Sequence, residues 1–524
     1  MKRYWRLGEP WVWLSGAALT ATLLAAATLL VVIMVNGLGV FWPGAEARLT
    51  LKDGSKIFGE VVQRGEKPDG GERLQLSTGN RDLYGLDFRW IDSADVALID
   101  YPGDALIVER TEYGNFHGFL RQLNGSAAVT SEQLHLELNQ LRQARSVVAD
   151  LEEEMNELSG ASESNRLKIR KREFAGKRDA ADYQLLQQRQ NELDRQFQQV
   201  QGRHSEAIAD LRTSVAVFAD AAGTTREVTL ADIVRVYAPN AMSLPAKVGH
   251  YLSKIWELLS DEPRESNTEG GLFPAIFGTV MLIFLMSAFS FPVGVLAGIY
   301  LREYARDGFF VRLVRIAVNN LAGIPSIVYG IFGLGFFVYG IGGGIDRFFF
   351  PESLPTPTFG TGGILWASLT LALLTVPVVI VATEEALGAI PGDIRAGSLA
   401  LGATKLQTLM RILLPMASPG IMTGFILAMA RAAGEVAPLM ITGVVKLAPS
   451  LPLDGSFPFL HLDRKFMHLG FHIYDIGFQS PNVEAAKPMV YVTTLLLVLI
   501  VLVMNSIAIR LRNRMKKRYS YGTF

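Results

Sequence analysis

The chain has 524 residues, of which 49% are hydrophobic and 19% are charged, and its mean hydropathy is +0.25. Its 50 basic and 50 acidic residues give a net charge of zero, which removes any global electrostatic argument for nucleic acid binding. The sequence contains no cysteine, so it offers neither a disulfide framework nor thiolate chemistry. This composition favours an integral membrane protein over a string of soluble domains.

The apolar residues are gathered in six runs, each near or above the ~20 residues that a membrane-spanning helix needs. The first run could be a signal peptide, because basic residues precede it. It is long and has no convincing cleavage site, so we interpret it as an uncleaved span. We therefore predict an α-helical integral membrane protein with six transmembrane helices, over residues 11–35, 272–301, 311–339, 362–383, 419–441 and 489–509.

The positions of lysine and arginine predict how the spans are oriented. Lys2, Arg3 and Arg6 precede the first span, further arginines separate the second from the third, and the tail RLRNRMKKR is densely basic. With six spans these regions lie on one side of the membrane, which we expect to be the cytoplasm. Residues 1–45 then form the cytoplasmic tip and first span, residues 46–250 an extracytoplasmic insertion, and residues 251–524 a core with five spans.

The insertion combines two kinds of pattern. Residues 46–128 and 213–240 alternate apolar and polar positions, with a turn signal at Asp53 and Gly54, and predict a small β domain. Residues 129–212 carry seven-residue apolar repeats and predict an antiparallel coiled-coil hairpin with its tip at LSGASESN, residues 158–165. The hairpin is either a structural arm or a docking element for a partner protein.

Several kinds of chemistry have no support in the sequence. Gly397, Gly402 and Thr404 have the spacing of a phosphate-binding loop, but Ala403 stands where the lysine is required. If transport by this protein uses ATP, another chain must therefore supply it. His461, His468 and His472 form only a loose group, so we expect no metal site, and no catalytic arrangement can be identified.

Arg431 and Glu435 are the notable charges of the fifth span. They are four residues apart and are predicted to share one helical face. An arginine at a helix centre costs ~2.5 to 3.5 kcal/mol, so we expect the pair to face protein or a water-filled path. The pair either fastens two helices or lies on the route of an anion. Arginine presents a fork of donors that matches an oxyanion, which favours phosphate or sulfate over a sugar.

The third span carries a proline and several glycines in NNLAGIPSIVYGIFGLGFF. Proline removes a backbone hydrogen bond and small residues permit close helix packing, so we predict a kink at Gly323, Pro325 and Ser326. The kink either serves packing alone or forms a gate.

The loop at residues 384–418, between the fourth and fifth spans, contains the stretch GATKLQTLMRILLP at residues 402–415. Leu406, Leu409, Ile412 and Leu413 recur at helical spacing and predict an amphipathic helix. On the cytoplasmic face such a helix could lie on lipid or dock into a groove of a soluble partner.

This loop resembles the one that permeases of binding-protein-dependent ABC importers carry: EAA, three residues, Gly, nine residues, Ile, one residue, Leu-Pro. Gly402, Ile412, Leu414 and Pro415 match that spacing, while the triplet falls on Ala396, Gly397 and Ser398 and so lacks its glutamate. With LAGIPSIVYGIFGLG, TEEAL and ARAAGEVAPLMITG in order, residues 270–510 and the first span resemble the PstA family of phosphate permeases.

The resemblance implies a type I ABC importer permease, not itself an enzyme, with no cofactor of its own. Its implied partners are a second permease (PstC-like), an ATPase dimer that holds ATP and Mg (PstB-like) and a periplasmic phosphate-binding protein (PstS-like). It also implies a bacterial inner membrane location, with the insertion in the periplasm and both termini in the cytoplasm. By the resemblance, Arg431 and Glu435 lie on the phosphate path, and the residues that couple to the ATPase are Ala396, Gly397, Gly402, Ala403, Ile412, Leu414 and Pro415.

Two alternatives stay open. The chain could be a permease for another oxyanion, sulfate or molybdate. It could also be a membrane-anchored envelope scaffold or sensor whose hairpin recruits a partner.

Overall fold

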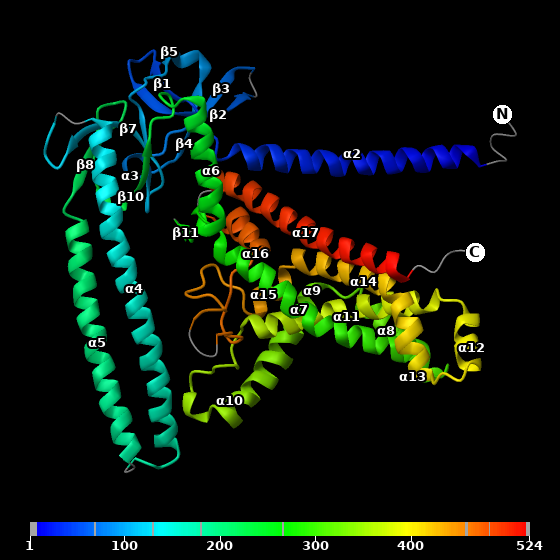
Figure 1. Cartoon of the computed structure of the whole chain (residues 1–524). Helices are drawn as coiled ribbons and strands as arrows, with labels where there is room; N and C mark the ends of the chain where they lie inside the picture. Colours follow the sequence, from blue (N-terminus) through cyan, green and yellow to red (C-terminus); the bar gives the residue numbers. More distant parts are fainter. Residues whose placement is uncertain are drawn as a thin grey trace.

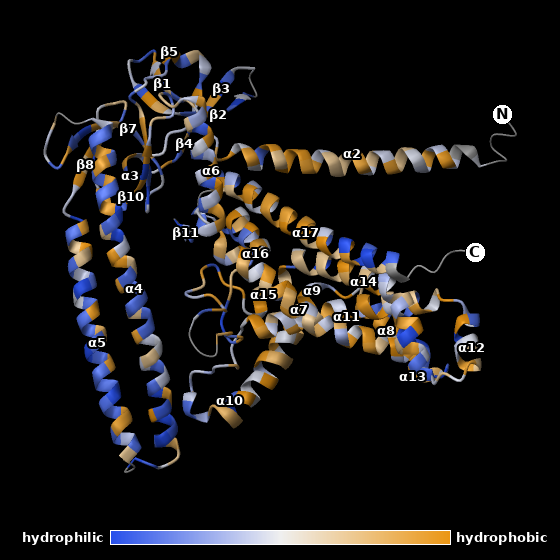
Figure 2. Ribbon diagram, viewed as in Figure 1, coloured by the Kyte–Doolittle hydropathy of each residue, from blue (hydrophilic) through white to orange (hydrophobic). Residues whose placement is uncertain are grey.

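The computed structural model describes residues 8–67, 70–127, 130–178, 181–264, 267–455, 459–480 and 483–519. It consists of a membrane bundle (residues 8–39 and 273–519), a β module (residues 46–123 and 215–237) and a long helical hairpin that projects from this module (Figure 1). Figure 2 shows hydrophobic residues over the bundle and mainly hydrophilic residues along the hairpin. Lys2, Arg3 and Arg6, used to predict the orientation, lie outside the described residues.

Six helices are long and apolar enough to cross a membrane, as the sequence predicted: Trp11–Gly39, Phe273–Tyr304, Ser326–Phe349, Ile364–Gly388, Lys405–Gly434 and Val483–Lys517. Figure 1 labels their α-helical parts α2 (Glu9–Gly39), α7 (Phe273–Ile299), α9 (Ser326–Phe332), α10 (Gly343–Phe349), α11 (Ile364–Gly388), α13 (Lys405–Thr408), α14 (Leu414–Gly434) and α17 (Val483–Tyr519). Three π-helical segments extend or join them: η4 (Tyr300–Tyr304), η5 (Gly333–Gly342) and η7 (Leu409–Leu413). α2 stands apart from the other spans and contacts α17 at its C-terminal end.

α11 is the central helix of the bundle and contacts both α7 and α14. Glycines let these backbones approach closely. A Cβ atom at Gly294 of α7 would lie 2.6 Å from Cβ of Val379, and one at Gly424 of α14 would lie 2.2 Å from Cβ of Ala382. Helices in lipid associate through such close packing, because no hydrophobic effect draws them together. These positions therefore fix α7 and α14 against α11.

The predicted start of the third span was wrong, since the span begins at Ser326 rather than near residue 311. Phe309–Leu321 forms a separate amphipathic helix, α8, and the chain is not helical between Leu321 and Ser326. Arg315 of α8 donates a 3.1 Å hydrogen bond from Nε to Glu384 Oε1 at the end of α11. The apolar face of α8 raises the average hydropathy, so the sequence pattern merged two helices into one.

The β module contains two antiparallel five-stranded sheets, in the orders β4-β3-β2-β1-β5 and β10-β6-β7-β8-β9. The turn between β1 and β2 passes through Asp53 and Gly54, and the φ of 86° at Gly54 suits glycine. The strands are β1 (Glu46–Leu51), β2 (Lys56–Glu66), β3 (Glu72–Ser77), β4 (Phe88–Asp92), β5 (Val96–Asp100), β6 (Leu106–Arg110), β7 (Phe116–Leu123), β8 (Val215–Ala219), β9 (Thr225–Thr229) and β10 (Ile233–Tyr237).

The helical hairpin is inserted between β7 and β8 and consists of α4 (Ser131–Phe174) and α5 (Ala181–Leu211). The predicted tip at residues 158–165 was wrong, because α4 continues through this segment to Phe174. Asn165 is buried there and donates through Nδ2 to Leu186 O at 2.9 Å and to Gln190 Oε1 at 3.1 Å. The polar residues that suggested a turn therefore pair across the two helices.

α6 connects the β module to the membrane bundle through a cluster of buried charges. Glu257 of α6 contacts Arg235 at 3.1 Å, Lys254 at 3.3 Å and Arg264, and Glu109 contacts Lys254 at 2.7 Å. Burying one of these charges without its partner costs several kcal/mol, so the cluster holds α6 rigidly on the sheet. The elements at this junction are α6 (Leu244–Ser260), β11 (Pro263–Arg264) and β12 (Glu269–Gly270).

Leu134 holds the base of the hairpin, and its replacement is the first test of this fold. Its side chain is fully buried with Phe116 and Phe218 of the β module. Leu134→Ala should cost about 2–5 kcal/mol of local stability. Hydrogen exchange on the full chain in detergent should then be faster at the start of α4. Leu136→Ala, at a side chain that is 62% exposed, is the control. Equal exchange in both variants would contradict this packing.

Candidate functional site

Arg431 and Glu435 lie where α14 ends inside the membrane bundle. The prediction of one helix through both residues was wrong, because α14 ends at Gly434 and Glu435 is extended, with φ −80° and ψ 128°. In a continuous helix the ring of Pro438 would clash with the carbonyl of Gly434, so the chain restarts as α15 (Ala437–Thr442). The two charges still contact each other, with Arg431 Nε 3.6 Å from Glu435 Oε1.

A second interruption precedes α9. The predicted kink inside the third span was misplaced, since Pro325 is the N-cap residue of α9 and not an interior residue. Gly323 lies in the non-helical link after α8, and Ser326 is the first residue of α9. The Tyr329 hydroxyl donates a 2.7 Å hydrogen bond back to Leu321 O. This bond spans the interruption and holds the end of α8 against α9.

The two interruptions lie side by side in the bundle, where Figure 1 places α9 and α15 near its middle. A Cβ atom at Gly330 of α9 would lie 2.8 Å from Cα of Pro438. Tyr329 is within electrostatic range of Arg431 and shares a buried cluster with Ala432 and Leu439. The structure thus brings the predicted gate segment and the predicted charged pair to one region.

The ends of the interrupted helices bring polar backbone groups into this region. Helix ends leave backbone N–H and C=O groups without intrahelical partners, and in a membrane such groups are tolerated only inside protein or beside water. Discontinuous helices of this kind build ion and substrate sites near the membrane midplane. The side chain of Arg431 is 35% exposed and that of Glu435 is 20% exposed, so the pair remains accessible. The arrangement can receive an anion.

The chain leading into the fifth span, residues 392–410, forms two helical segments joined by a tight turn, which we call the hook. The predicted separate amphipathic helix at residues 402–415 was wrong, because Lys405 begins the long helix that continues through α14. α12 (Gly392–Ala400) precedes it, and Gly402 makes the turn with a φ of 86°. Thr404 caps the next helix, since its Oγ1 accepts from Gln407 N at 3.2 Å and its N donates to Gln407 Oε1 at 2.9 Å.

Arg395 fastens this hook to the bundle. Its Nη2 donates to Glu303 Oε1 at 2.8 Å and to Leu387 O at 2.6 Å, and the hydroxyls of Ser398 and Thr408 lie 2.8 Å apart. The hook is therefore attached to the ends of both α7 and α11. Of the residues predicted to couple to an ATPase, Ala396, Gly397 and Gly402 are exposed, Ala403 is half-buried, and Ile412, Leu414 and Pro415 lie half-buried in the following helix.

Some residues that shape these two regions were not predicted from the sequence. Thr404 and Gln407 have the threonine-to-glutamine spacing of a capping box, and that signal could have located the helix start. Tyr329 and Arg395 had no such signal, because their partners Leu321 and Glu303 become neighbours only in the folded chain.

The three histidines of the segment before the last span have separate roles. His461 contacts Asp454 at 3.1 Å, His468 accepts from Gly470 N at 3.1 Å as an N-cap, and His472 lies 3.3 Å from the Thr493 hydroxyl. Within the described part of the chain, no group of three or more metal-ligating side chains is present.

Six apolar helices, two of which end or begin beside an ion pair, define a multi-pass membrane protein with the architecture of a permease. The family model described as binding-protein-dependent transport system inner membrane component matches residues 290–517. That range excludes the β module and the hairpin.

Related proteins identify the kind of permease more closely. The chain is 34% identical to a probable phosphate transport system permease protein PstA of Methanocaldococcus jannaschii, over 41% of this chain and 67% of the relative. It is 34% identical to the phosphate transport system permease protein PstA of Yersinia pestis, over 47% of this chain and 74% of that relative. A probable ABC transporter permease protein of Bacillus subtilis, YqgI, is 31% identical over 41% of this chain and 70% of that relative. The chain belongs to the binding-protein-dependent ABC transporter permeases and is PstA-like.

The cap at Thr404 can be tested directly. Thr404→Ala removes the acceptor for Gln407 N and should cost ~1 kcal/mol at the start of this helix. Hydrogen exchange of the full chain should then be faster at residues 405–408. Thr423→Ala is the control, because the Thr423 hydroxyl donates to Pro419 O within a helix and caps nothing. Unchanged exchange in Thr404→Ala would show that the cap contributes no stability.

Proposed function

We propose that this ABC importer permease carries phosphate. Together with a second permease (PstC-like) it forms the path through the membrane, and a periplasmic binding protein (PstS-like) delivers the anion. The similarity to phosphate transport system permeases of the PstA type supports the substrate. The observation that carries the proposal is the placement of a carboxylate beside an arginine where two helices are interrupted.

Arg431 retains its hydrogen-bond donors in this arrangement. Its 3.6 Å distance to Glu435 is longer than a hydrogen bond, so the carboxylate balances the charge without occupying the guanidinium. The planar fork can then bind two oxygens of a tetrahedral oxyanion.

Glu435 distinguishes phosphate from sulfate. Hydrogen phosphate has an O–H group that can donate to a carboxylate, whereas sulfate has none and meets only like charge. A site built to accept such a hydrogen bond rejects the analogue that lacks it. The pair therefore favours phosphate over sulfate or molybdate, which are the competing substrates.

Arg431→Gln should abolish phosphate uptake. The measurement is radiolabelled phosphate uptake by cells that lack their own importers and express the complete complex, with permease levels checked. We expect at least a tenfold loss, because the anion loses its fixed positive partner. Arg347→Gln, at an exposed arginine of α10, is the control. Uptake that survives Arg431→Gln would make the pair structural, and wild-type uptake that unlabelled sulfate suppresses would indicate another oxyanion.

We also propose that an ATPase dimer (PstB-like), which holds ATP and Mg, docks on the hook. Four apolar side chains are exposed there: Leu401 at 91%, Leu406 at 60%, Met410 at 57% and Leu399 at 50%. Clustered exposed apolar residues are typical of a protein interaction site. The hook lies at the opposite end of the bundle from the β module (Figure 1). With the hook and both termini in the cytoplasm of a bacterium, the insertion lies in the periplasm.

Leu401→Asp should disrupt this docking. A charge on the most exposed of the four side chains should reduce co-purification of the ATPase at least tenfold without unfolding the permease, since nothing buried is disturbed. Leu185→Asp is the matched control, because Leu185 is 66% exposed on the hairpin. ATPase that co-purifies equally with both variants would place the docking surface elsewhere.

A further inference from the structure

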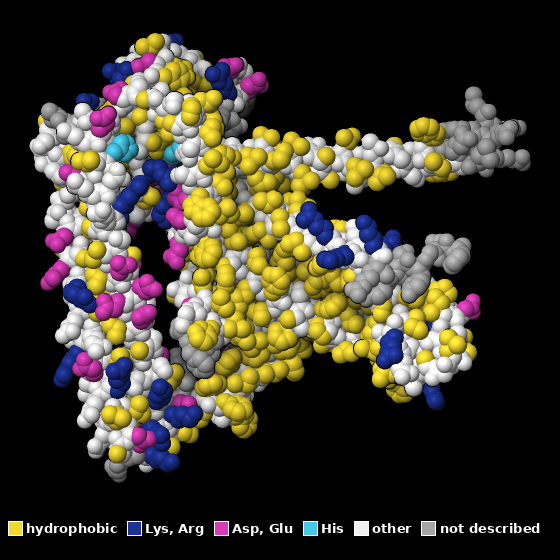
Figure 3. Space-filling model, in the orientation of Figure 1, with side chains coloured by type: hydrophobic (Ala, Val, Ile, Leu, Met, Phe, Trp, Pro, Cys, Tyr) yellow, Lys and Arg dark blue, Asp and Glu magenta, His cyan; other side chains and the backbone are white. Residues whose placement is uncertain are grey.

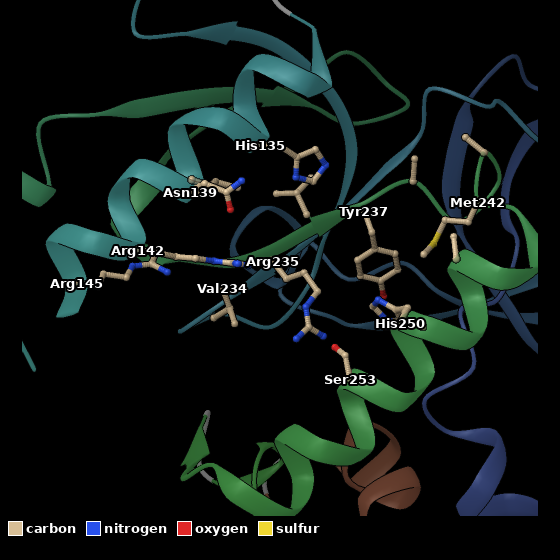
Figure 4. Close-up of a pocket in the computed structure, with 16 residues that line it drawn as sticks. His135, Asn139, Arg142, Arg145, Val234, Arg235, Tyr237, Met242, His250 and Ser253 are labelled. Atoms are coloured by element: carbon tan, nitrogen blue, oxygen red, sulfur yellow. The ribbon is translucent and has the colours of Figure 1, made fainter.

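A cavity of about 520 Å³ lies between α4, β10 and α6, where the hairpin leaves the β module (Figure 4). Its sixteen lining residues include three arginines, Arg142, Arg145 and Arg235, and two histidines, His135 and His250, but no aspartate or glutamate. Figure 3 shows Lys, Arg and His side chains gathered at this end of the gap between the hairpin and the bundle. The lining therefore carries more basic than acidic side chains, with Glu257 and Glu109 behind Arg235.

Arg142 and Arg145 form no ion pair within the described residues, and the charge of Asp232 acts on Arg145 only from a distance. Arg145 Nη2 donates to the backbone oxygens of Leu230, Ala231 and Ile233 at 2.7–2.9 Å, and these partners are neutral. Burial, and then the nearby charge of Arg142, lower the pKa of Arg145. Arg142 itself is exposed and extends toward the cavity (Figure 4). An anion placed here would relieve this repulsion.

Arg235 offers a free donor from the opposite wall. Its Nη2 donates to Glu257 Oε2 at 3.1 Å, but its buried Nη1 has no hydrogen-bond acceptor among the described residues and lies 3.9 Å from Glu109 Oε2. A buried donor left unpaired costs about 1–3 kcal/mol. An oxyanion between α4 and β10 would supply the missing acceptor once the Arg235 side chain turns the buried Nη1 toward the cavity.

The rest of the lining is apolar or aromatic. Tyr237 and His250 have their ring centroids 4.3 Å apart, and Leu138, Val236 and Met242 lie beside them. Cavities of roughly 300–1,000 Å³ with such walls hold small organic ligands, whereas a free inorganic ion would occupy only a small part of the volume. We propose that this cavity binds a phosphate monoester, with its phosphate group between Arg142 and Arg235 and its organic part against the apolar wall.

This site is separate from the proposed transport path, since it lies in the insertion and shares no residue with the region around Arg431. It adds a ligand site to a part of the chain that the family match does not include. The two proposals can therefore fail independently.

The test is equilibrium dialysis on the full chain purified in detergent, with radiolabelled glycerol 3-phosphate, AMP and inorganic phosphate as probes. At least one ester should bind more tightly than inorganic phosphate. Arg142→Gln should weaken that binding at least tenfold, and because Arg142 is exposed the variant should elute as the wild type does. Arg170→Gln is the control, at an exposed arginine about 40 Å further along the same helix. Arg431→Gln should bind the ester normally.

Any of the following results would overturn the proposal. The first is that neither ester binds at millimolar concentration. The second is that inorganic phosphate binds as tightly as the esters, which would make the ligand the free ion. The third is that Arg142→Gln binds as the wild type does, or that Arg431→Gln loses ester binding, which would place the ester in the transport path.

Discussion

The close contact of α7 and α14 with α11 is the constraint on which the membrane bundle depends. Gly298 of α7 lies against Thr383, where a Cβ atom would come within 2.7 Å of Cβ, and Gly420 of α14 lies against Ala386 at 2.6 Å. Lipid supplies no hydrophobic force between helices, so van der Waals packing over these small residues must hold them. A larger side chain at any of these positions would separate two helices along their length.

This packing is what permits the interruptions in α14 and before α9. A helix that ends inside a membrane exposes unpaired backbone groups, which lipid cannot satisfy. Because α14 is held on α11, Ala432 and Ala433 are buried just before the break, and α15 closes against α9 at Gly330 and Pro438. The same rigidity keeps Arg431 beside Glu435. The site is thus a consequence of the packing, and not of the local sequence alone.

Hydropathy predicted the six apolar helices because length and apolar content are properties of each segment alone. Hydropathy did not predict correctly where these helices begin and end. α8 was merged with the third span because one apolar face is enough to raise an average, and Glu435 was placed in a helix although Pro438 forbids it. The hairpin tip was misplaced because Asn165 satisfies its polar group on the partner helix, a contact that no local pattern shows. Residues that act through distant neighbours, such as Tyr329 and Arg395, could not be predicted.

The β module and the bundle are joined by the charges around α6. Glu257 pairs with Arg235 of β10 and Arg264 of β11, so α6 cannot shift without leaving a charge unpaired in a buried position. Its far end is tied to the bundle by the 2.7 Å hydrogen bond from Leu272 N to Leu258 O, one residue before α7 begins. The arginine-lined cavity is bounded by this same helix. α6 therefore connects the wall of the cavity to the start of α7, the helix whose glycines set the packing on α11.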